Sequence, residues 1–304
     1  MTLAVFYYPW YGGANSTIDK YRHWKSGYNG ATHNPPTTYY SYWLPDVSGV
    51  VTNDAAIRLY DSFDQAVVKR QMDFIKQAHI ECVIWSWFGK DTYSDKAMAA
   101  FWNSPNNPAG LKHCIYYERR WDSTVTEQKV LDDINYVKTK YAVGDKYMKV
   151  NGKPVVFVYN IKPPTDTLLN LAKKWKVVRD KTGIHTNLKE FPGWQDNRSL
   201  ADCWHQYTPT VNYYKTVSTS GNSKYSSFVS PGFWKKGQTD APRLSRDLNR
   251  FKNDLIKMKN DGTGWKLLET WNEWPEGTGL EPATNVVTNE NIGTTYINAI
   301  ASVF

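Results

Sequence analysis

The sequence lacks the features that mark several large classes of protein. It has no apolar run of about 18 residues, so we expect no segment that inserts into a membrane. It begins with a strand-like apolar run, residues 3–8, and not with a charged segment followed by an apolar one, so no export signal is recognisable. The compartment therefore stays open: extracellular or cell-surface if a signal was removed, and cytoplasmic otherwise.

Residues that bind metals or act as nucleophiles are also scarce. The three cysteines, Cys82, Cys114 and Cys203, lie far apart in apolar runs, which predicts buried free thiols and not a zinc site or a disulfide framework. Ser86 and Ser230 lack a surrounding G-x-S-x-G, no H-E-x-x-H motif occurs, and the glycines form no phosphate-binding loop. These absences exclude zinc proteases, serine hydrolases and nucleotide-dependent enzymes. We expect that no metal or organic cofactor is needed.

Acidic residues are fewer than basic ones, 29 against 37, which gives a net charge of +8 and a pI near 9.1. This balance is compatible with binding to nucleic acid or to an acidic glycan. The densest basic patch, however, alternates with apolar Leu171, Trp175 and Val178 at helical spacing, which is typical of the solvent-facing side of a helix. The patch consists of Lys173, Lys174, Lys176, Arg179 and Lys181. We therefore expect no nucleic-acid partner.

Short apolar runs alternate along the chain with segments of helical periodicity, which is the order of repeated βα units around a parallel sheet. Eight strands are predicted, at residues 3–8, 81–87, 112–117, 154–159, 186–190, 203–207, 227–230 and 265–271. Between strands, apolar residues recur at spacings of three and four, as in residues 68–79, 130–141 and 244–258. A last helix is predicted at residues 296–303.

No linker or shift in composition divides the chain, so we predict a single domain over residues 1–304. Its length suits a (β/α)8 TIM barrel, which takes about 250 residues plus insertions. Two stretches exceed a minimal barrel, residues 12–64 after strand 1 and residues 192–237 around strands 6 and 7. We expect both to be long βα loops at the end where barrel enzymes have their active sites.

Aromatic residues are abundant, with 14 Trp and 21 Tyr, which is more than the filling of a core requires. Many of them follow the predicted strands directly, where strand ends converge on one cup. Aromatic rings pack on the apolar faces of sugars, whereas the alternative is that these rings only cap the barrel core. The residues predicted from the strand ends to bind substrate are Tyr8, Trp10, Tyr11, Trp87, Tyr159, Tyr207, Trp271 and Asn272.

Two glutamates, Glu273 and Glu276, follow the eighth predicted strand. Hydrolysis of a glycoside requires an acid that protonates the leaving oxygen and a second carboxylate that assists at the anomeric centre. A Glu-x-x-Glu pair also occurs on exposed helices, but the adjacent Trp271 and Asn272 disfavour a solvated face. Pro275 is suited to the first turn of a helix and fixes the loop between the two acids. We expect burial to raise the pKa of the proton donor while its partner stays ionised.

The segment W-N-E-W-P-E-G-T at residues 271–278, followed by L-E-P at 280–282, resembles the signature that closes the barrel in glycoside hydrolase family 99. Further matching motifs are F-Y-Y-P-W-Y-G at 6–12, H-W at 23–24, Y-D-S-F-D at 60–64, W-S-W at 85–87 and N-G-K-P-V-V-F-V-Y at 151–159. The sequence also resembles a related group of bacterial polysaccharide-locus proteins, which share the W-N-E-W-x-E-G core. Family 99 usually has His at position x, where this chain has Pro275.

The resemblance to family 99 implies an endo-acting α-mannosidase or α-mannanase. By this resemblance, Glu273 is the base on the sugar 2-hydroxyl and Glu276 is the general acid and then the base. A 1,2-anhydro sugar intermediate with net retention is also implied, which requires a 2-hydroxyl trans-diaxial to the leaving group, as in α-mannosides. The matched motifs add His23, Trp24 and Tyr60 to the predicted substrate-binding residues.

Some polar residues of the long first loop have two interpretations. His23, beside Trp24, fits either a contact to a sugar hydroxyl or a structural role, and His33 lies in the same loop. Asp61 and Asp64 precede a predicted helix, and Asp64 is better suited to cap that helix than to act in catalysis.

We therefore predict a retaining glycoside hydrolase, expected to be endo-acting on α-linked, mannoside-like glycans. Two alternatives stay open: a glycan-binding barrel without turnover, and a protein of surface-polysaccharide assembly. The presence of Glu273 and Glu276, together with Asn272 and Gly277, favours the enzyme. The expected partner is an oligosaccharide or polysaccharide substrate, and we expect the protein to act as a monomer.

Overall fold

The fold is described from a computed structural model of the chain. The structure describes residues 1–14, 16–17, 20–24, 41–46, 59–122, 124–159, 166–216, 225–235, 237 and 239–304. His33 and parts of the two long loops lie outside the described residues.

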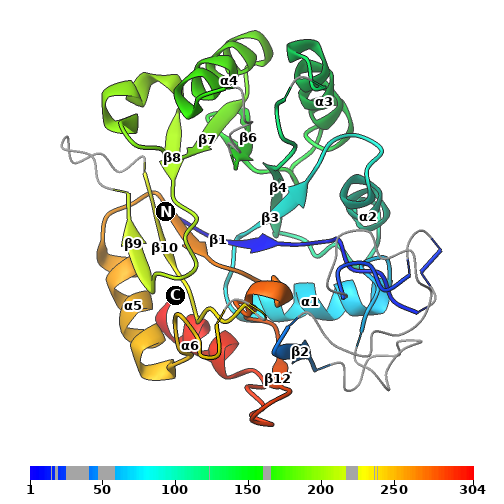
Figure 1. The fold of residues 1–304 in the computed structure, drawn as a ribbon. Coiled ribbons are helices and arrows are strands. Elements are labelled where there is room, and N and C mark those ends of the chain that lie inside the picture. The colour runs from blue at the N-terminus through cyan, green and yellow to red at the C-terminus, as the bar shows by residue number, and fades with distance from the viewer. Residues whose placement is uncertain are drawn as a thin grey trace.

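Eight parallel strands form the main sheet, and they are the eight that the sequence predicts. They are β1 (Thr2–Tyr7), β3 (Cys82–Trp87), β4 (Lys112–Tyr117), β6 (Lys153–Val158), β7 (His185–Lys189), β8 (Cys203–His205), β10 (Ser226–Val229) and β11 (Trp265–Leu268). Their order is β8-β7-β6-β4-β3-β1-β11-β10, and every neighbouring pair is parallel. Most of their side chains are buried, as expected for a parallel sheet covered on both faces. Figure 1 shows these strands at the centre of the molecule in a curled arrangement.

Strands β8 and β10, at the two ends of the parallel series, are in contact but form no ladder of backbone hydrogen bonds in the described residues. Strand β9 (Tyr213–Lys215) pairs antiparallel with β10 and takes up the edge of β10 that is not paired with β11. β8 contacts β10 through a side chain, because the Ser226 hydroxyl donates to the carbonyl oxygen of Trp204 at 2.7 Å. Within the described residues no ladder joins β8 to β10. The structure thus gives the eight strands in the order of a barrel, with β9 on the edge that a closed barrel would use.

In the described part of the chain, six α-helices surround the sheet (Figure 1): α1 (Gln65–Gln77), α2 (Tyr93–Trp102), α3 (Glu127–Lys140), α4 (Leu168–Thr182), α5 (Leu248–Asn260) and α6 (Thr295–Val303). The periodic apolar positions are buried as predicted, for example Met72, Ile134 and Phe251. Asp64 caps α1, since its carboxylate accepts from the backbone N–H of Ala66 at 2.9 Å, so the capping interpretation is confirmed.

The basic patch of α4 lies on its outer side, as predicted. Its charges pair with acidic residues of the surface, for example Lys176 with Asp180 at 2.5 Å and Lys181 with Glu127 at 2.6 Å. Helix α2 was not predicted, because a buried acid, Asp95, interrupts its apolar face.

The units that follow β7 and β8 depart from a regular barrel. After β7 the chain forms a 3₁₀ segment, η1 (Trp194–Leu200), and after β8 it forms β9, with no α-helix in the described part of either connection.

Small additions are β2 (Trp43–Pro45) paired with β12 (Ala283–Asn285), β5 (Lys149–Val150) on the edge of β6, and the 3₁₀ turn η2 (Trp274–Glu276). No helix in the described ranges is both long and apolar enough to span a membrane. The three cysteines are buried thiols, as predicted, and are not joined in disulfides.

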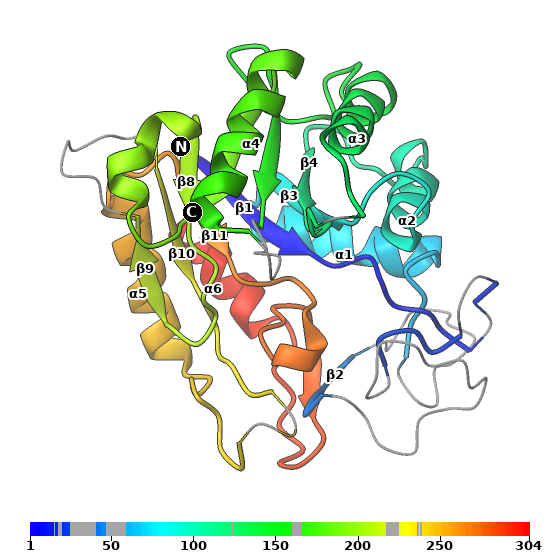
Figure 2. The ribbon, with the colours of Figure 1, turned by 45° about the horizontal axis from the view of Figure 1, so that its top comes forward.

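Alternation along each strand decides which side chains reach the inside of the curled sheet. Phe6 points inward, with its ring centroid 4.8 Å from that of Tyr116. The next residue, Tyr7, points outward and donates to the amide oxygen of Gln71 in α1 at 2.6 Å. The chain that leaves β1, strand β2 and the segment after β11 gather at one end of the sheet (Figure 2), which is the end that carries the site.

Candidate active site

Residues at the carboxyl ends of the strands line one cavity of about 220 Å³. Its lining residues are Tyr8, Trp10, His23, Phe88, Tyr116, Glu118, Tyr159, Tyr207, Lys235, Glu273, Pro275 and Glu276. A larger cavity of about 800 Å³ lies at the opposite end of the sheet, where Thr2, His185 and Trp265 begin their strands, but no glutamate lines it. The smaller cavity is therefore the candidate active site, because it combines aromatic rings with a carboxyl pair and the larger cavity does not.

Seven of the predicted site residues line this cavity together: Glu273, Glu276, Tyr8, Trp10, His23, Tyr159 and Tyr207. The Tyr8 hydroxyl donates to that of Tyr207 at 2.8 Å, which joins the ends of β1 and β8 across the cavity. The Trp10 ring stacks on His23, with centroids 4.4 Å apart and an interplanar angle of 11°. The cavity thus has flat aromatic walls from several strand ends.

Trp87 was predicted to face the same cavity, and the structure places it elsewhere. Its indole N–H donates to the Asp95 carboxylate in α2 at 3.0 Å, and its ring lies beside Tyr117 and Tyr136. The reason is strand alternation: in β3 Ser86 points inward, so Trp87 points to the helices. This prediction was wrong about the direction of the side chain.

Five further predicted residues lie in a buried layer beneath the cavity and do not line it: Tyr11, Trp24, Tyr60, Trp271 and Asn272. The Tyr60 hydroxyl accepts from the side chains of Asn272 at 3.0 Å and Trp274 at 3.1 Å, and it donates to Glu281 at 3.1 Å. Asn272 in turn accepts from the backbone N–H of Tyr8 at 2.8 Å and donates to its carbonyl oxygen at 3.0 Å. These residues hold the segment of the glutamate pair rather than face a ligand.

Local backbone geometry places the two glutamates. The backbone N–H of Glu273 donates to the Thr270 hydroxyl at 3.0 Å, and Pro275 occupies the first turn of η2, as predicted. Gly277 ends this turn at φ +66°, where a Cβ atom would lie 3.0 Å from the carbonyl oxygen of Trp234. Arg246 donates to the carbonyl oxygen of Gly277 at 3.0 Å. The turn that carries Glu276 is therefore fixed from both sides.

Burial dominates the electrostatics of the pair. It raises the pKa of Glu273 well above its usual value, and repulsion from Glu276 and Glu118 adds to this rise. Burial also raises the pKa of Glu276, although Lys235, Lys189 and a hydrogen bond from Tyr207 oppose the rise. Each carboxyl has one buried oxygen without a hydrogen-bond partner. The expected division, in which only the donor has a raised pKa, is not observed, and the two carboxyls behave as a coupled pair.

Two other buried carboxyls were not among the predicted site residues. Glu118 follows β4 and lines the cavity, and burial raises its pKa to about 8. Glu269 follows β11, is fully buried, and accepts from the backbone N–H of Thr208 at 3.3 Å. Burial raises the pKa of Glu269 well above its usual value, with repulsion from Glu276 as the second cause. The sequence could have indicated them, because each is an ionisable residue at the end of an apolar strand. Glu118 is also two residues after Tyr116, so it points to the same, inner side of the sheet.

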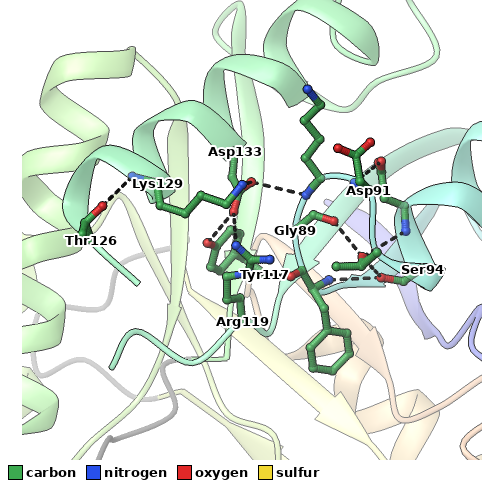
Figure 3. Close-up of polar contacts among 12 residues, drawn as sticks. Gly89, Asp91, Ser94, Tyr117, Arg119, Thr126, Lys129 and Asp133 are labelled. Atoms are coloured by element: carbon green, nitrogen blue, oxygen red, sulfur yellow. Dashed lines mark hydrogen bonds and ion pairs between the residues drawn. The ribbon is translucent and has the colours of Figure 1, made fainter. Parts of the chain in front are cut away.

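A saturated polar network outside the sheet holds this wall in place (Figure 3). Asp133 of α3 accepts from Lys129 at 3.0 Å and from the Tyr117 hydroxyl at 3.1 Å, and it pairs with Arg119 at 3.4 Å. Arg119 donates to the carbonyl oxygen of Phe88 at 2.8 Å. Because Glu118 lies between Tyr117 and Arg119 in the chain, this network fixes the backbone of Glu118 and Phe88 from behind.

Among the residues that the structure describes, no group of three or more His, Cys, Asp or Glu side chains could hold a metal ion. His205 is buried behind the cavity and hydrogen-bonded to Asn187 at 3.0 Å, and burial lowers its pKa to about 3. The chemical groups at the cavity are therefore carboxyls, two lysines near them and aromatic rings. A carboxyl pair beside aromatic walls in one cavity is the arrangement expected of a glycoside hydrolase.

Comparison with known proteins gives the family. Residues 1–183 match the model of Glycosyl hydrolase family 99, which is more than half of the 304 residues. The chain belongs to this family and is a glycoside hydrolase. The matched range ends before the segment with Glu273 and Glu276. No curated protein matches the chain by sequence.

Solved structures agree with the fold over the whole chain. The GH99 endo-alpha-mannosidase from Bacteroides thetaiotaomicron is similar with a TM-score of 0.74 and 18% identity, covering 99% of this chain and 95% of that one. A structure of the GH99 enzyme from this organism with bis-tris-propane gives a TM-score of 0.73, 16% identity and the same coverage. A glycoside hydrolase-like protein is similar with a TM-score of 0.62 and 14% identity, covering 100% of this chain and 93% of that one. At these identities the similarity shows the fold alone.

Proposed function

We propose that the protein is a retaining, endo-acting glycosidase for α-linked, mannoside-like glycans, with Glu273 and Glu276 as its catalytic pair. One observation carries the proposal: the carboxyls of Glu273 and Glu276 line one cavity with aromatic walls, and each has a buried oxygen without a hydrogen-bond partner. The similar structures are of GH99 endo-alpha-mannosidases, which supports the choice of substrate class.

The scaffold that we propose is a closed (β/α)8 barrel formed by residues 1–304 as one catalytic domain. The strand order and the contact between Ser226 and Trp204 support closure between β8 and β10. In this scaffold the substrate-binding walls would be Tyr8, Trp10, His23, Tyr159 and Tyr207. Tyr11, Trp24, Tyr60, Trp271 and Asn272 would act by holding the walls and the glutamate segment.

In the first step of the proposed reaction, the Glu273 carboxylate accepts the proton of the sugar 2-hydroxyl. The freed oxygen attacks C1, the glycosidic bond breaks, and Glu276 gives its proton to the leaving oxygen. In the second step Glu276 accepts a proton from water as the water attacks C1. The bond from C1 to the 2-oxygen opens, and that oxygen regains its proton from Glu273. Two inversions at C1 give net retention.

The proposal requires that the pair hold one proton when substrate is bound. Burial raises the pKa of both carboxyls, and repulsion from Glu276 adds to the rise at Glu273, so the loss of the second proton is disfavoured near neutral pH. The reactive arrangement places the remaining proton on Glu276. The 2-hydroxyl would hydrogen-bond to the ionised Glu273 and favour this arrangement.

The proposal is tested by incubating the protein with a panel of α-linked oligosaccharides and measuring new reducing ends. We expect cleavage of an α-mannoside with a free 2-hydroxyl and no cleavage of its 2-deoxy analogue, because the 2-oxygen is the nucleophile. Equal cleavage of both would contradict the mechanism. Binding without any cleavage across the panel would favour the alternative of a glycan-binding barrel.

A further inference from the structure

Lys189 ends β7 beside the cavity, and its ammonium has an unusual position. It lies 4.1 Å from the centroid of the Tyr159 ring, which forms part of the cavity wall. Lys189 itself does not line the cavity. Within the described ranges no carboxylate lies within 4.0 Å of this ammonium, in contrast to Lys266, which pairs directly with Asp261. The charge is thus held by an aromatic face.

Three carboxyls from separate parts of the chain act on this ammonium through their charge, and two of them, Glu118 and Glu276, line the same cavity as Tyr159. They are Glu118 after β4, Glu269 after β11 and Glu276 in η2. The charge of Lys189 lowers the pKa of each of them, against the rise caused by burial. Burial in turn lowers the pKa of Lys189, and the three carboxyls oppose that change. One cation therefore serves three buried acids.

We propose that Lys189 is a positioning residue for the proposed reaction: its ammonium, held against Tyr159, is the shared counter-charge that stabilises Glu276 once it has given up its proton. The inference rests on the proposed function of Glu276. When Glu276 becomes a carboxylate, it does so in a buried space near Glu118 and Glu269, where an added negative charge is costly without a cation. A fixed cation behind the wall lowers that cost without contacting the sugar.

The other cation near the pair, Lys235, differs in its placement. Lys235 lines the cavity and lowers the pKa of both Glu273 and Glu276, whereas Lys189 is not among the charges that shift Glu273. Other titratable groups that line the cavity with Glu276 are Tyr207, which donates to it, Tyr159, whose pKa burial raises to about 12, and Tyr8, Tyr116 and His23. Lys235 is the stronger of the two influences on Glu276, and Lys189 differs from it in acting from the Tyr159 ring and not from the cavity lining.

The test compares Lys189→Met with Lys189→Arg in the full chain. Carboxyl ¹³C NMR of glutamate-labelled protein, assigned with Glu276→Gln and Glu273→Gln, follows each carboxyl against pH. We expect the midpoint of Glu276 to move up by about 1 pH unit in Lys189→Met, with a smaller change for Glu273, because an opposite charge nearby is lost. Lys189→Arg should restore the midpoint. Lys140→Met is the matched control, since that ammonium also lies over an aromatic ring, at 5.1 Å from Tyr136, but on the outer face of α3.

Kinetics give a second readout on an α-linked oligosaccharide. We expect Lys189→Met to lower kcat roughly tenfold or more with little change in KM, and to move the pH optimum upward, since the summed pKa of the pair rises. Lys189→Gln is the second variant if Lys189→Met does not fold. An unchanged Glu276 midpoint in a folded variant would refute the inference even if the enzyme is active. Full activity of both Glu273→Gln and Glu276→Gln would instead refute the proposed function, whatever the midpoints.

Discussion

Buried carboxylates occur on both sides of the sheet, and their surroundings differ. Outside the sheet, Asp95 and Asp133 have all their buried oxygens hydrogen-bonded: Asp95 accepts from Trp87, Tyr141 and Tyr136 at 2.7–3.0 Å. Inside, three carboxyls that line the cavity, Glu118, Glu273 and Glu276, and the buried Glu269 each have one buried oxygen without a hydrogen-bond partner. A saturated buried acid stabilises a fold, whereas an unsatisfied one with a raised pKa marks a place where chemistry is expected.

The largest effect on stability is expected where the saturated side is broken. Asp133→Ala leaves Arg119 and the Tyr117 hydroxyl without their partner in a buried site, so the free energy of unfolding should fall by about 3–5 kcal/mol. Urea denaturation measures this change. Asp132→Ala, at the exposed neighbouring position of α3, should change stability by less than about 0.5 kcal/mol. Similar losses in the two variants would remove the contrast.

On the cavity side, replacing a buried acid is expected to stabilise the protein at higher pH and not to destabilise it. The pKa of Glu118 is about 8 in the folded protein against 4.5 as its ordinary value, so the folded state binds the proton more tightly. Stability is therefore lost as pH rises from about 4.5 through about 8. Glu118→Gln should remove this loss, and its stability relative to the parent protein should rise between pH 5 and pH 9 by more than about 1.4 kcal/mol, the value of one pKa unit. Thermal unfolding at both pH values checks this, with the exposed Glu127→Gln as control. A flat difference would argue against a buried, proton-retaining acid.

Much of the fold follows from the sequence because its signals are local. Short apolar runs define most of the eight strands, although β8 has only three residues and β7 only one apolar residue, and spacings of three and four define the helices α1, α3, α4, α5 and α6. β9 was not predicted, since three half-buried residues with two tyrosines give no clear alternation. Its pairing with β10 depends on contacts between chain segments that no local pattern encodes.

The types of residue at the site could be predicted from the sequence, but the direction of their side chains could not. Tyr116 and Tyr117 are adjacent at the end of β4, yet Tyr116 lines the cavity and Tyr117 bonds to Asp133 outside the sheet. A one-residue difference in parity reverses the two faces, and the strand ends alone do not fix it. This is why Trp87 was placed in the cavity by the sequence analysis and why Glu118 and Glu269 were not.

A smaller loss is expected beneath the cavity, where Tyr60 links Asn272, Trp274 and Glu281. Tyr60→Phe removes one hydroxyl that makes three hydrogen bonds, so unfolding should become easier by about 1–3 kcal/mol. Activity should also fall, since the segment of the glutamate pair loses a fixed point. Chemical denaturation and initial rates measure the two effects. A fully active, equally stable variant would show that this layer does not hold the pair.

The smallest effect is expected at the cap of α1, where Asp64 does not line the cavity. Asp64→Ala removes the acceptor for the backbone N–H of Ala66, which should lower the free energy of unfolding by about 1 kcal/mol and leave kcat/KM unchanged. Asp73→Ala is the control on the same helix, because its ion pair with Lys69 is exposed and contributes little. A strong loss of activity in Asp64→Ala without loss of stability would restore Asp64 as a catalytic candidate.

The central claim is the division of roles between Glu273 and Glu276, and the most direct measurement is the leaving-group dependence of Glu276→Gln and Glu273→Gln. An activated aryl group departs without protonation, so Glu276→Gln should retain most activity on an aryl glycoside and lose about 10²–10⁴-fold on a natural sugar leaving group. Glu273→Gln should lose activity with both, because the 2-hydroxyl needs its base whichever group departs. The reverse pattern would exchange the two roles. If neither variant lowers the rate by at least roughly tenfold, about 1.4 kcal/mol, these glutamates are not the catalytic pair.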